Sequence, residues 1–446
     1  MPKAHMGSVG VSRSWCVKAL GSGMACLMLA GCVADSAAPD IAALGPDLES
    51  KNASLLDAKS VSSETKPIAV ADLKPQAEQP KPLSYQFVTK ASYGLPALNR
   101  EFPSTFGFSG NNIDHLLLGG GTSWQSKPEK NAGQVTTSLV LSAGRLFYGD
   151  NKGAVHAVAA SNGASLWTVR LSNGKADQSI VTLFADKNEL YAATDKGHVI
   201  AISAKSGTVR WQKKVSGPVK GALRPLADNL LLQIGGNQLF TLSKAKAEAG
   251  WSYKSNHPIK ALAVSSGGIQ LLNDKNEFVR LNAKTGEQRT KNTLPNPQTA
   301  SQLVTTSDDL IVSGKGGIHR YTTNSPKMLW KQKNGIEGQV IVSGDTIFST
   351  GRDNVLRAFK RADGKLNWLS KLPAIKANNT AARWSRPILA GGRLHLASNT
   401  GYVASFNADD GKLILLRNIK APLNSAPIVA SGRLYIVAAN GRVYRL

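Results

Sequence analysis

An eleven-residue frame recurs seven times between residues 157 and 415 and dominates the sequence. In the copy at residues 201–211, AISAKSGTVRW, the second residue is apolar, the seventh is glycine and the last is tryptophan. Glycine at the seventh position supplies the positive φ that a tight turn between two strands needs. The frame therefore predicts a short β-hairpin that ends on a large apolar side chain, able to cover the gap to a neighbouring sheet. The second positions are Val158, Ile202, Leu242, Leu281, Tyr321, Phe359 and Phe406, and the frame glycines are Gly163, Gly207, Gly286, Gly364 and Gly411.

An alternating strand opened by turn residues precedes each frame, as in GRLFYGD at residues 144–150 and GRLYIVA at residues 432–438. Eight such starts occur, about 40 residues apart, and another apolar segment precedes most of them. Four strands in a repeat of this length are typical of one blade of a β-propeller. The sequence thus predicts an all-β fold, an eight-bladed β-propeller built from four-stranded antiparallel blades.

The eighth repeat lacks its outermost strand, because it ends with GRVYRL at residues 441–446. Trp124, in the segment GTSWQSK, stands where a blade-ending tryptophan would stand. We therefore expect a strand around Trp124 to complete the last blade and close the ring, which leaves no open sheet edge. The predicted propeller domain spans residues 121–446.

Residues 1–32 have the pattern of a signal peptide: a basic start without acidic residues, then an apolar segment. Residues 29–32 read Leu-Ala-Gly-Cys, which resembles the lipobox of bacterial lipoproteins. That resemblance implies cleavage before Cys32, lipidation of Cys32 (palmitate among the acyl chains) and, with Val33 following, sorting to the outer membrane. A plain secretory signal with an incidental Cys32 is the alternative. All three cysteines lie in this leader, so the processed chain would have neither a disulfide nor a thiol nucleophile.

Residues 33–120 are rich in alanine, serine, proline and lysine and show no sustained hydrophobic period. Such a composition predicts a disordered tether between the anchor and the propeller.

The formal net charge is +25, and about +22 remains without the three basic residues of the leader. A charge of this size favours anionic partners. Solvated lysines that block pairing at blade edges are the alternative. Nucleic acid fits the sign of the charge, but the sequence has no nucleic-acid-binding motif and the expected compartment is the periplasm.

Trp384 is the one additional tryptophan of the predicted ring, in the longest connection between two blades, with Arg383 and Arg386 beside it. Tryptophan and arginine are enriched at interface hot spots, so these three residues are the candidate partner-binding site. A core-packing role for Trp384 is the alternative. His156 and His319 occupy the same frame position in blades one and five, across the ring from each other, so we predict no shared metal site.

The repeated frame is similar to the PQQ-like propeller repeat. Together with the lipobox, the eight repeats and the N-terminal Trp124 strand, it makes residues 122–446 resemble the BamB family of outer-membrane assembly lipoproteins. The resemblance implies a non-catalytic, lipid-anchored scaffold on the periplasmic face of the outer membrane. Its expected partners are BamA-type POTRA domains and nascent outer-membrane proteins. The loops at residues 255–267 and 292–302 lack the Leu-x-Leu-Arg stretch and spaced aspartates of better-studied members, so no contact residues are carried over.

Two other functions remain open. The charge favours a propeller that binds an anionic envelope polymer, such as peptidoglycan or lipopolysaccharide. PQQ-dependent dehydrogenases share the repeat, but resemblance to them would require adjacent cysteines and a cluster of acidic ligands, and every cysteine lies in the leader. We therefore expect no enzymatic activity, no catalytic residue, no cofactor and no metal.

Overall fold

The computed structural model describes residues 85–93, 95–100, 102, 115–130, 132–171, 178–265, 267–295, 300–333, 338–377 and 380–446. The chain divides into two units at Ser62 and Ser63, and every described residue belongs to the second unit. The predicted signal peptide with Cys32, and the predicted tether up to residue 84, lie outside the described residues.

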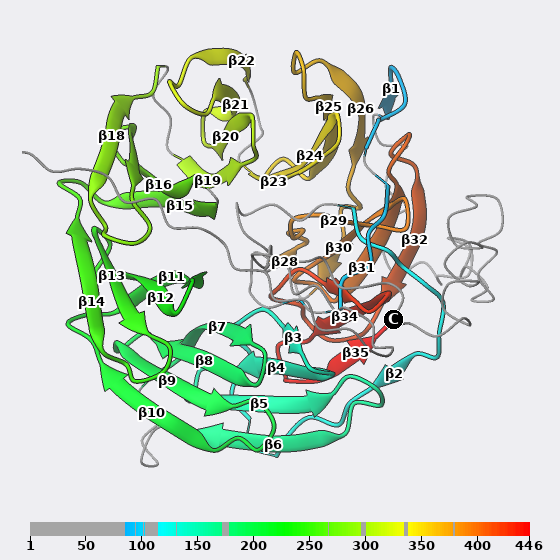
Figure 1. The fold of residues 1–446 in the computed structure, drawn as a ribbon. Coiled ribbons are helices and arrows are strands. Elements are labelled where there is room, and N and C mark those ends of the chain that lie inside the picture. Colours follow the sequence, from blue (N-terminus) through cyan, green and yellow to red (C-terminus); the bar gives the residue numbers. More distant parts are fainter. Residues whose placement is uncertain are drawn as a thin grey trace, which may run out of the picture. The chain divides into compact units, whose positions relative to one another are not determined.

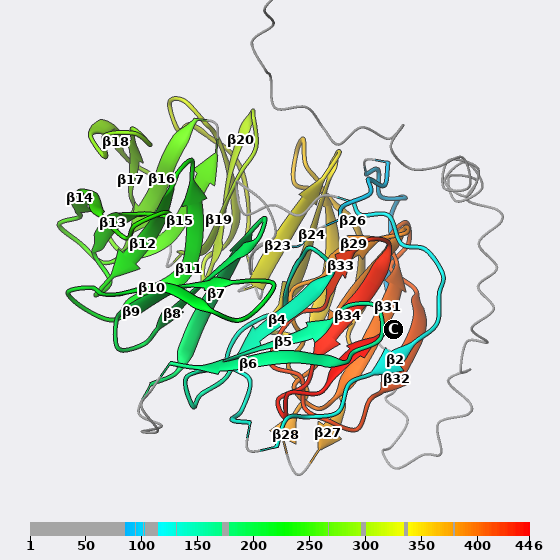
Figure 2. The same ribbon diagram turned by 60° about the horizontal axis from the view of Figure 1, so that its bottom comes forward.

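Eight antiparallel sheets follow one another around a ring, which confirms the predicted eight-bladed propeller (Figures 1 and 2). Blade one contains β3 (Val140–Ser142), β4 (Arg145–Gly149), β5 (Ala154–Ala159) and β6 (Ser165–Arg170). Blade two contains β7 (Ile180–Asp186), β8 (Glu189–Thr194), β9 (His198–Ser203) and β10 (Val209–Lys214). Blade three contains β11 (Val219–Leu226), β12 (Asn229–Ile234), β13 (Gln238–Ser243) and β14 (Ala249–Lys254). Blade four contains β15 (Ile259–Ser265), β16 (Gly268–Asn273), β17 (Glu277–Leu281) and β18 (Gln288–Thr293).

The second half of the ring repeats this order. Blade five contains β19 (Ala300–Thr305), β20 (Asp309–Gly314), β21 (Gly317–Thr322) and β22 (Met328–Gln332). Blade six contains β23 (Gly338–Ser343), β24 (Thr346–Gly351), β25 (Val355–Lys360) and β26 (Leu366–Lys371), with β1 (Gln86–Phe87) as a fifth strand. Blade seven contains β29 (Ile388–Ala390), β30 (Arg393–Ala397), β31 (Tyr402–Asn407) and β32 (Leu413–Asn418). Blade eight contains β33 (Ile428–Ala430), β34 (Arg433–Val437), β35 (Val443–Arg445) and β2 (Trp124–Gln125). A small hairpin, β27 (Lys376–Ala377) and β28 (Thr380–Ala381), joins blade six to blade seven and lies at the lower edge of Figure 2.

The core lies between neighbouring blades. One cluster, for example, joins Phe147 of blade one to Leu190 and Ile200 of blade two. Second strands such as β16 and β24 are buried throughout, whereas the outermost strand β18 is largely exposed. A single sheet buries its apolar side chains only against another layer, so each blade depends on its neighbours for stability.

Tryptophan and glycine from different blades meet at the seams of the ring. A Cβ added at each frame glycine would lie within 3.0 Å of the tryptophan of the preceding blade. The pairs are Trp124 with Gly163, Trp167 with Gly207, Trp251 with Gly286, Trp330 with Gly364, and Trp368 with Gly411. The indole Nε1 of Trp368 also donates a hydrogen bond to the Ala408 carbonyl of the next blade, at 3.1 Å. The frame glycine is therefore required twice, for its positive φ and for the space that the indole fills.

The N-terminal strand β2 closes the ring as predicted. Trp124 pairs with Arg445 and Gln125 with Tyr444 in an antiparallel register. The guanidinium of Arg445 lies over the Trp124 ring, 6.0 Å from its centroid, and donates hydrogen bonds to the Thr122 and Ser161 carbonyls. The last blade is thus completed by residues from the beginning of the propeller domain.

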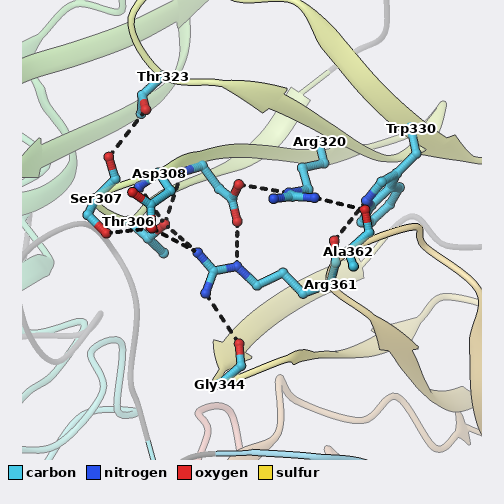
Figure 3. A network of polar contacts seen from close by, with 10 residues as sticks. Thr306, Ser307, Asp308, Arg320, Thr323, Trp330, Gly344, Arg361 and Ala362 are labelled. Carbon is cyan, nitrogen blue, oxygen red and sulfur yellow. Dashed lines mark hydrogen bonds and ion pairs between the residues drawn. The ribbon is translucent and has the colours of Figure 1, made fainter.

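A polar network joins blades five and six (Figure 3). Asp309, at the start of β20, is fully buried and accepts hydrogen bonds from Nε of Arg320 at 2.7 Å and Nε of Arg361 at 2.5 Å. Arg361 comes from the turn that follows β25, and its Nη2 donates to the Thr306 hydroxyl at 3.2 Å. One carboxylate thereby holds two guanidinium groups from two adjacent blades.

The N-terminal strap, defined as the described residues from 85 to 102 and from 115 to 120, packs on blades six, seven, eight and one. Its strand β1 pairs with β26, and Leu116 forms a bridge with Ala390 of blade seven. Asn99 donates to the Val429 carbonyl of blade eight, and Phe102, fully buried, pairs with Leu141 of β3 in blade one. The tether prediction does not hold for these residues. Buried side chains of the strap enter two different core clusters, Ala91 in one and Phe102 and Leu116 in the other, and they are too irregularly spaced to give a hydrophobic period.

Removal of the Tyr93 hydroxyl should loosen the strap. In the wild type this hydroxyl donates a hydrogen bond of 2.7 Å to Oδ1 of Asp409, and the Ala91 amide bonds the Asp409 carbonyl. Tyr93→Phe loses one hydrogen bond to a charged group, so we expect the Ala91 amide to exchange with deuterium about fivefold faster, equivalent to about 1 kcal/mol. Tyr85→Phe, at an exposed position of the same segment, is the control. Equal exchange in all three proteins would show that this bond does not hold the strap.

Candidate functional site

The three residues of the predicted partner site at blade seven differ in how deeply they are buried. Arg383 is exposed, Trp384 is half-buried and Arg386 is only 7% exposed. Trp384 packs against the core that joins blades six and seven, and its Nε1 donates to the Pro373 carbonyl at 3.3 Å. Burial lowers the pKa of Arg386 to about 10, which leaves the guanidinium protonated at neutral pH. Among the three, only Arg383 offers its charge to solvent, and the contacts of Trp384 correspond to the packing alternative.

A groove of about 360 Å³ lies between the outermost strand of blade seven and the closing strand of blade eight. Its lining includes the aromatic rings of Trp124 and Tyr444 and the cations Arg417, Lys420 and Arg445. Sequence reasoning missed this groove because its walls come from residues 123–125, 417–420 and 444–446, which meet only when the ring closes. Cationic and aromatic side chains together suit an acidic, partly apolar chain segment.

A buried carboxylate and imidazole lie in blade one. Nε2 of His156 is 3.0 Å from Oδ2 of Asp150, and Nδ1 of His156 is 3.2 Å from the Thr168 hydroxyl. Asp150 also accepts hydrogen bonds from the backbone amides of Gly133 and Ala154, both at 2.8 Å. Although the order carboxylate–imidazole–hydroxyl resembles a catalytic triad, Asp150 and His156 are 0% and 1% exposed. Their contacts fix the turn after β4 and leave a substrate no access to the imidazole.

The pKa of Asp150 is lowered to about 2. Burial alone would raise this pKa, but the hydrogen bonds from His156, Ala154 and Gly133 to the carboxylate outweigh burial. An aspartate in the unfolded chain titrates near 3.8. The charged carboxylate therefore stabilises the fold above about pH 4, and this stability is lost as the pH falls through about 2.

Asp150→Asn should flatten this acid dependence. We expect the variant to lose about 2 kcal/mol of the free energy of unfolding at pH 6 and much less at pH 2, because the wild type has by then lost the same contribution. Urea denaturation at several pH values between 2 and 6 measures the difference. Asp228→Asn, at an exposed position, should keep the wild-type slope. A constant difference between Asp150→Asn and the wild type over this range would contradict the assignment.

The described residues contain no group of three or more His, Cys, Asp or Glu side chains arranged to hold a metal ion. His156 and His319 lie in different blades, each with its own hydrogen-bond partners. No helix in the described part of the chain has the length and apolar character needed to cross a bilayer.

Comparisons of the sequence with a family profile and with curated proteins identify the same family. The sequence profile of the outer membrane protein assembly factor BamB matches residues 151–368 and 352–446. BamB from Legionella pneumophila (strain Paris) is 22% identical over 153 residues, which are 32% of this chain and 38% of that protein. BamB from Yersinia pestis is 29% identical over 130 residues, 29% of this chain and 32% of that protein. The chain thus matches about a third of the length of these curated relatives.

Solved structures share the fold. BamB from Moraxella catarrhalis superposes with a TM-score of 0.58 at 16% identity, covering 73% of this chain and 97% of that chain. Quinohemoprotein alcohol dehydrogenase from Comamonas testosteroni superposes with a TM-score of 0.61 at 11% identity, covering 78% of this chain and 80% of that chain. At these identities the two structures establish the propeller architecture and nothing about activity.

Proposed function

Because the chain belongs to the family of the outer membrane protein assembly factor BamB, we propose that it acts as a non-catalytic scaffold lipoprotein in the assembly of outer-membrane proteins. The observation that carries the proposal is the match of the BamB profile to residues 151–368 and 352–446. In this proposal Cys32 bears the lipid and anchors the chain to the periplasmic face of the outer membrane. The partners are BamA-type POTRA domains and nascent outer-membrane proteins.

The geometry supports binding rather than chemistry. The one buried histidine–carboxylate pair in the described residues, Asp150 with His156, is closed to solvent. The groove between blades seven and eight and the exposed guanidinium of Arg383 both present positive charge. The side chains of Arg417 and Lys420 in the groove are exposed, as is that of Arg383, so they can contact a partner without opening the fold.

The direct test is crosslinking in intact cells, followed by affinity purification in mild detergent and mass spectrometry. We expect a BamA-type protein with POTRA domains to be enriched over a control purification with an unrelated outer-membrane lipoprotein. Recovery of the tagged chain without any such protein would reject the proposal.

A charge reversal tests the blade-seven site separately. Arg383→Glu should reduce recovery of the partner severalfold if the exposed guanidinium contacts it, because a reversed charge at an interface weakens association. Lys246→Glu, an exposed turn residue of blade three, changes the net charge equally and should not reduce recovery. Equal recovery with both variants would remove Arg383 from the interface and leave the scaffold proposal standing.

The net charge of +25 favours a second candidate, a propeller that binds an anionic envelope polymer. This function predicts retention on isolated peptidoglycan or on lipopolysaccharide that weakens as salt rises, since salt screens exposed charges. Retention that is unchanged between low and high salt would exclude it.

A further inference from the structure

A cavity of about 190 Å³ lies among the innermost strands of blades three, four and five. Strands β11, β15 and β19 supply most of its lining, and Figure 1 shows all three on the inner side of their sheets. Three cationic side chains line it: Lys220, Arg224 and Lys260. Among the described residues that line it, none is an aspartate or a glutamate. The cavity therefore concentrates positive charge away from the outer edges of the blades.

The two lysines reach the cavity because they occupy equivalent positions in neighbouring blades. Val219 and Ile259 are buried at the starts of β11 and β15, and Lys220 and Lys260 follow them directly. Successive residues of a strand point to opposite sides, so both ammonium groups face away from the buried layer. Neither lysine has an ion-pair partner among the residues that the structure describes. These positions differ from the paired lysines elsewhere, such as Lys244 with Asp186.

The third cation is brought in by an irregularity of β11. Between Lys220 and Arg224 this strand advances four residues, while its partner β12 advances two, from Gln233 to Leu231. Gly221 lies inside the irregularity with a φ of +68°. Bulges of this kind re-aim side chains and are frequent beside functional sites. Burial lowers the pKa of Arg224 to about 10, so its charge is kept at neutral pH.

The remaining polar groups of the lining are held by the main chain. Gln302 donates to the Val340 carbonyl at 3.0 Å and accepts from the Val340 amide at 2.8 Å. Gln233 donates to the carbonyls of Gly236 and Ile259. The ammonium groups of Lys220 and Lys260 are therefore available to a ligand, and they supply hydrogen-bond donors only.

We propose that this cavity binds a phosphate group, either as free phosphate or as the headgroup phosphate of an anionic lipid. Ammonium and guanidinium groups form short, charge-assisted hydrogen bonds with phosphate oxygens. A bound anion also relieves the mutual repulsion of three like charges gathered at one cavity. This site is independent of the scaffold function, because its ligand is a phosphate group and its residues belong to blades three to five, not to the blade-seven site.

The test is isothermal titration of the full chain, produced without lipidation, with sodium phosphate, using sodium chloride at matched ionic strength as the blank. We expect phosphate to bind and to raise the melting temperature of the wild type. The double variant Lys220→Gln, Lys260→Gln should bind it roughly 30-fold more weakly, because two charge-assisted contacts are lost. The matched control, Lys213→Gln with Lys254→Gln, removes two exposed lysines of the outermost strands β10 and β14 and should stay within about twofold of the wild type.

Vesicles distinguish the two sources of phosphate. Cosedimentation with vesicles of phosphatidylglycerol in phosphatidylcholine, lost in the cavity variant and competed by free phosphate, identifies a lipid headgroup as the ligand. Phosphate binding without cosedimentation identifies the free anion. Three results overturn the proposal: neither probe binding, unchanged binding by the cavity variant, or an equal loss in the control.

Discussion

Asp309→Asn should lower the free energy of unfolding by about 3–5 kcal/mol, because it leaves two largely buried guanidinium groups without their anion. Asp309 is fully buried, and the side chains of Arg320 and Arg361 are 17% and 22% exposed. Asparagine keeps the shape of the side chain, but it can accept a hydrogen bond through only one of its two terminal atoms. The amide nitrogen would then face one of the two Nε–H donors.

Asp308→Asn is the matched control for this prediction. Asp308 is the neighbouring aspartate, 77% exposed, and it lies 3.9 Å from Arg361. Exposed ion pairs contribute about 0–1 kcal/mol, so this substitution should change stability little. Urea denaturation of the two variants and the wild type measures both effects. Similar small losses in both would show that the network in Figure 3 does not fasten blade five to blade six.

Gly411→Ala should also lower the free energy of unfolding strongly, by about 3 kcal/mol. The added Cβ would lie 2.4 Å from Cε3 of Trp368, which is fully buried, and Gly411 has a φ of +77°. Overpacking of this kind costs about 1–3 kcal/mol, and a left-handed backbone costs alanine about 1 kcal/mol more.

The two causes can be separated. Gly235→Ala has a similar φ of +65° but no atom within 4 Å of the added Cβ, so only the backbone cost of about 1 kcal/mol is expected. In a Trp368→Ala background, which itself should lose about 3–5 kcal/mol, Gly411→Ala should fall to the same backbone cost, because the clash has gone. If Gly411→Ala costs the same with and without Trp368, the indole does not require a glycine beneath it.

The sequence predicted the eight-bladed architecture because the same strand pattern occurs eight times along the chain. Apolar alternation, the glycine turn and the terminal tryptophan recur at a spacing of about 40 residues. A repeat with an incomplete pattern is therefore still identified from the other repeats. The missing strand of the last repeat and the position of Trp124 were enough to predict closure of the ring. Residues 85–102 lack any such recurrence, and the sequence therefore gave no sign that Phe102 would be buried against Leu141.

The candidate sites were predicted less well. Trp384 was identified as an isolated tryptophan, but only the structure shows its ring packed between blades six and seven and Arg386 buried beside it. The groove at Arg417 and the cavity at Lys220 and Lys260 were invisible, because each is lined by residues of different repeats. The basic composition predicted a positively charged protein, but it did not predict where in the structure the cationic side chains gather.

By itself, the sequence determined the number of blades, the order of their strands and the strand that closes them, since these follow from local patterns repeated along the chain. Tertiary structure alone decided which residues of different blades meet: Trp368 over Gly411, Asp309 between two arginines, and the strap across four blades. The reason is that a blade's own pattern fixes its hydrogen bonds and its apolar faces. Contacts between adjacent blades depend on how the blades are rotated and spaced in the closed ring. No single repeat encodes that arrangement.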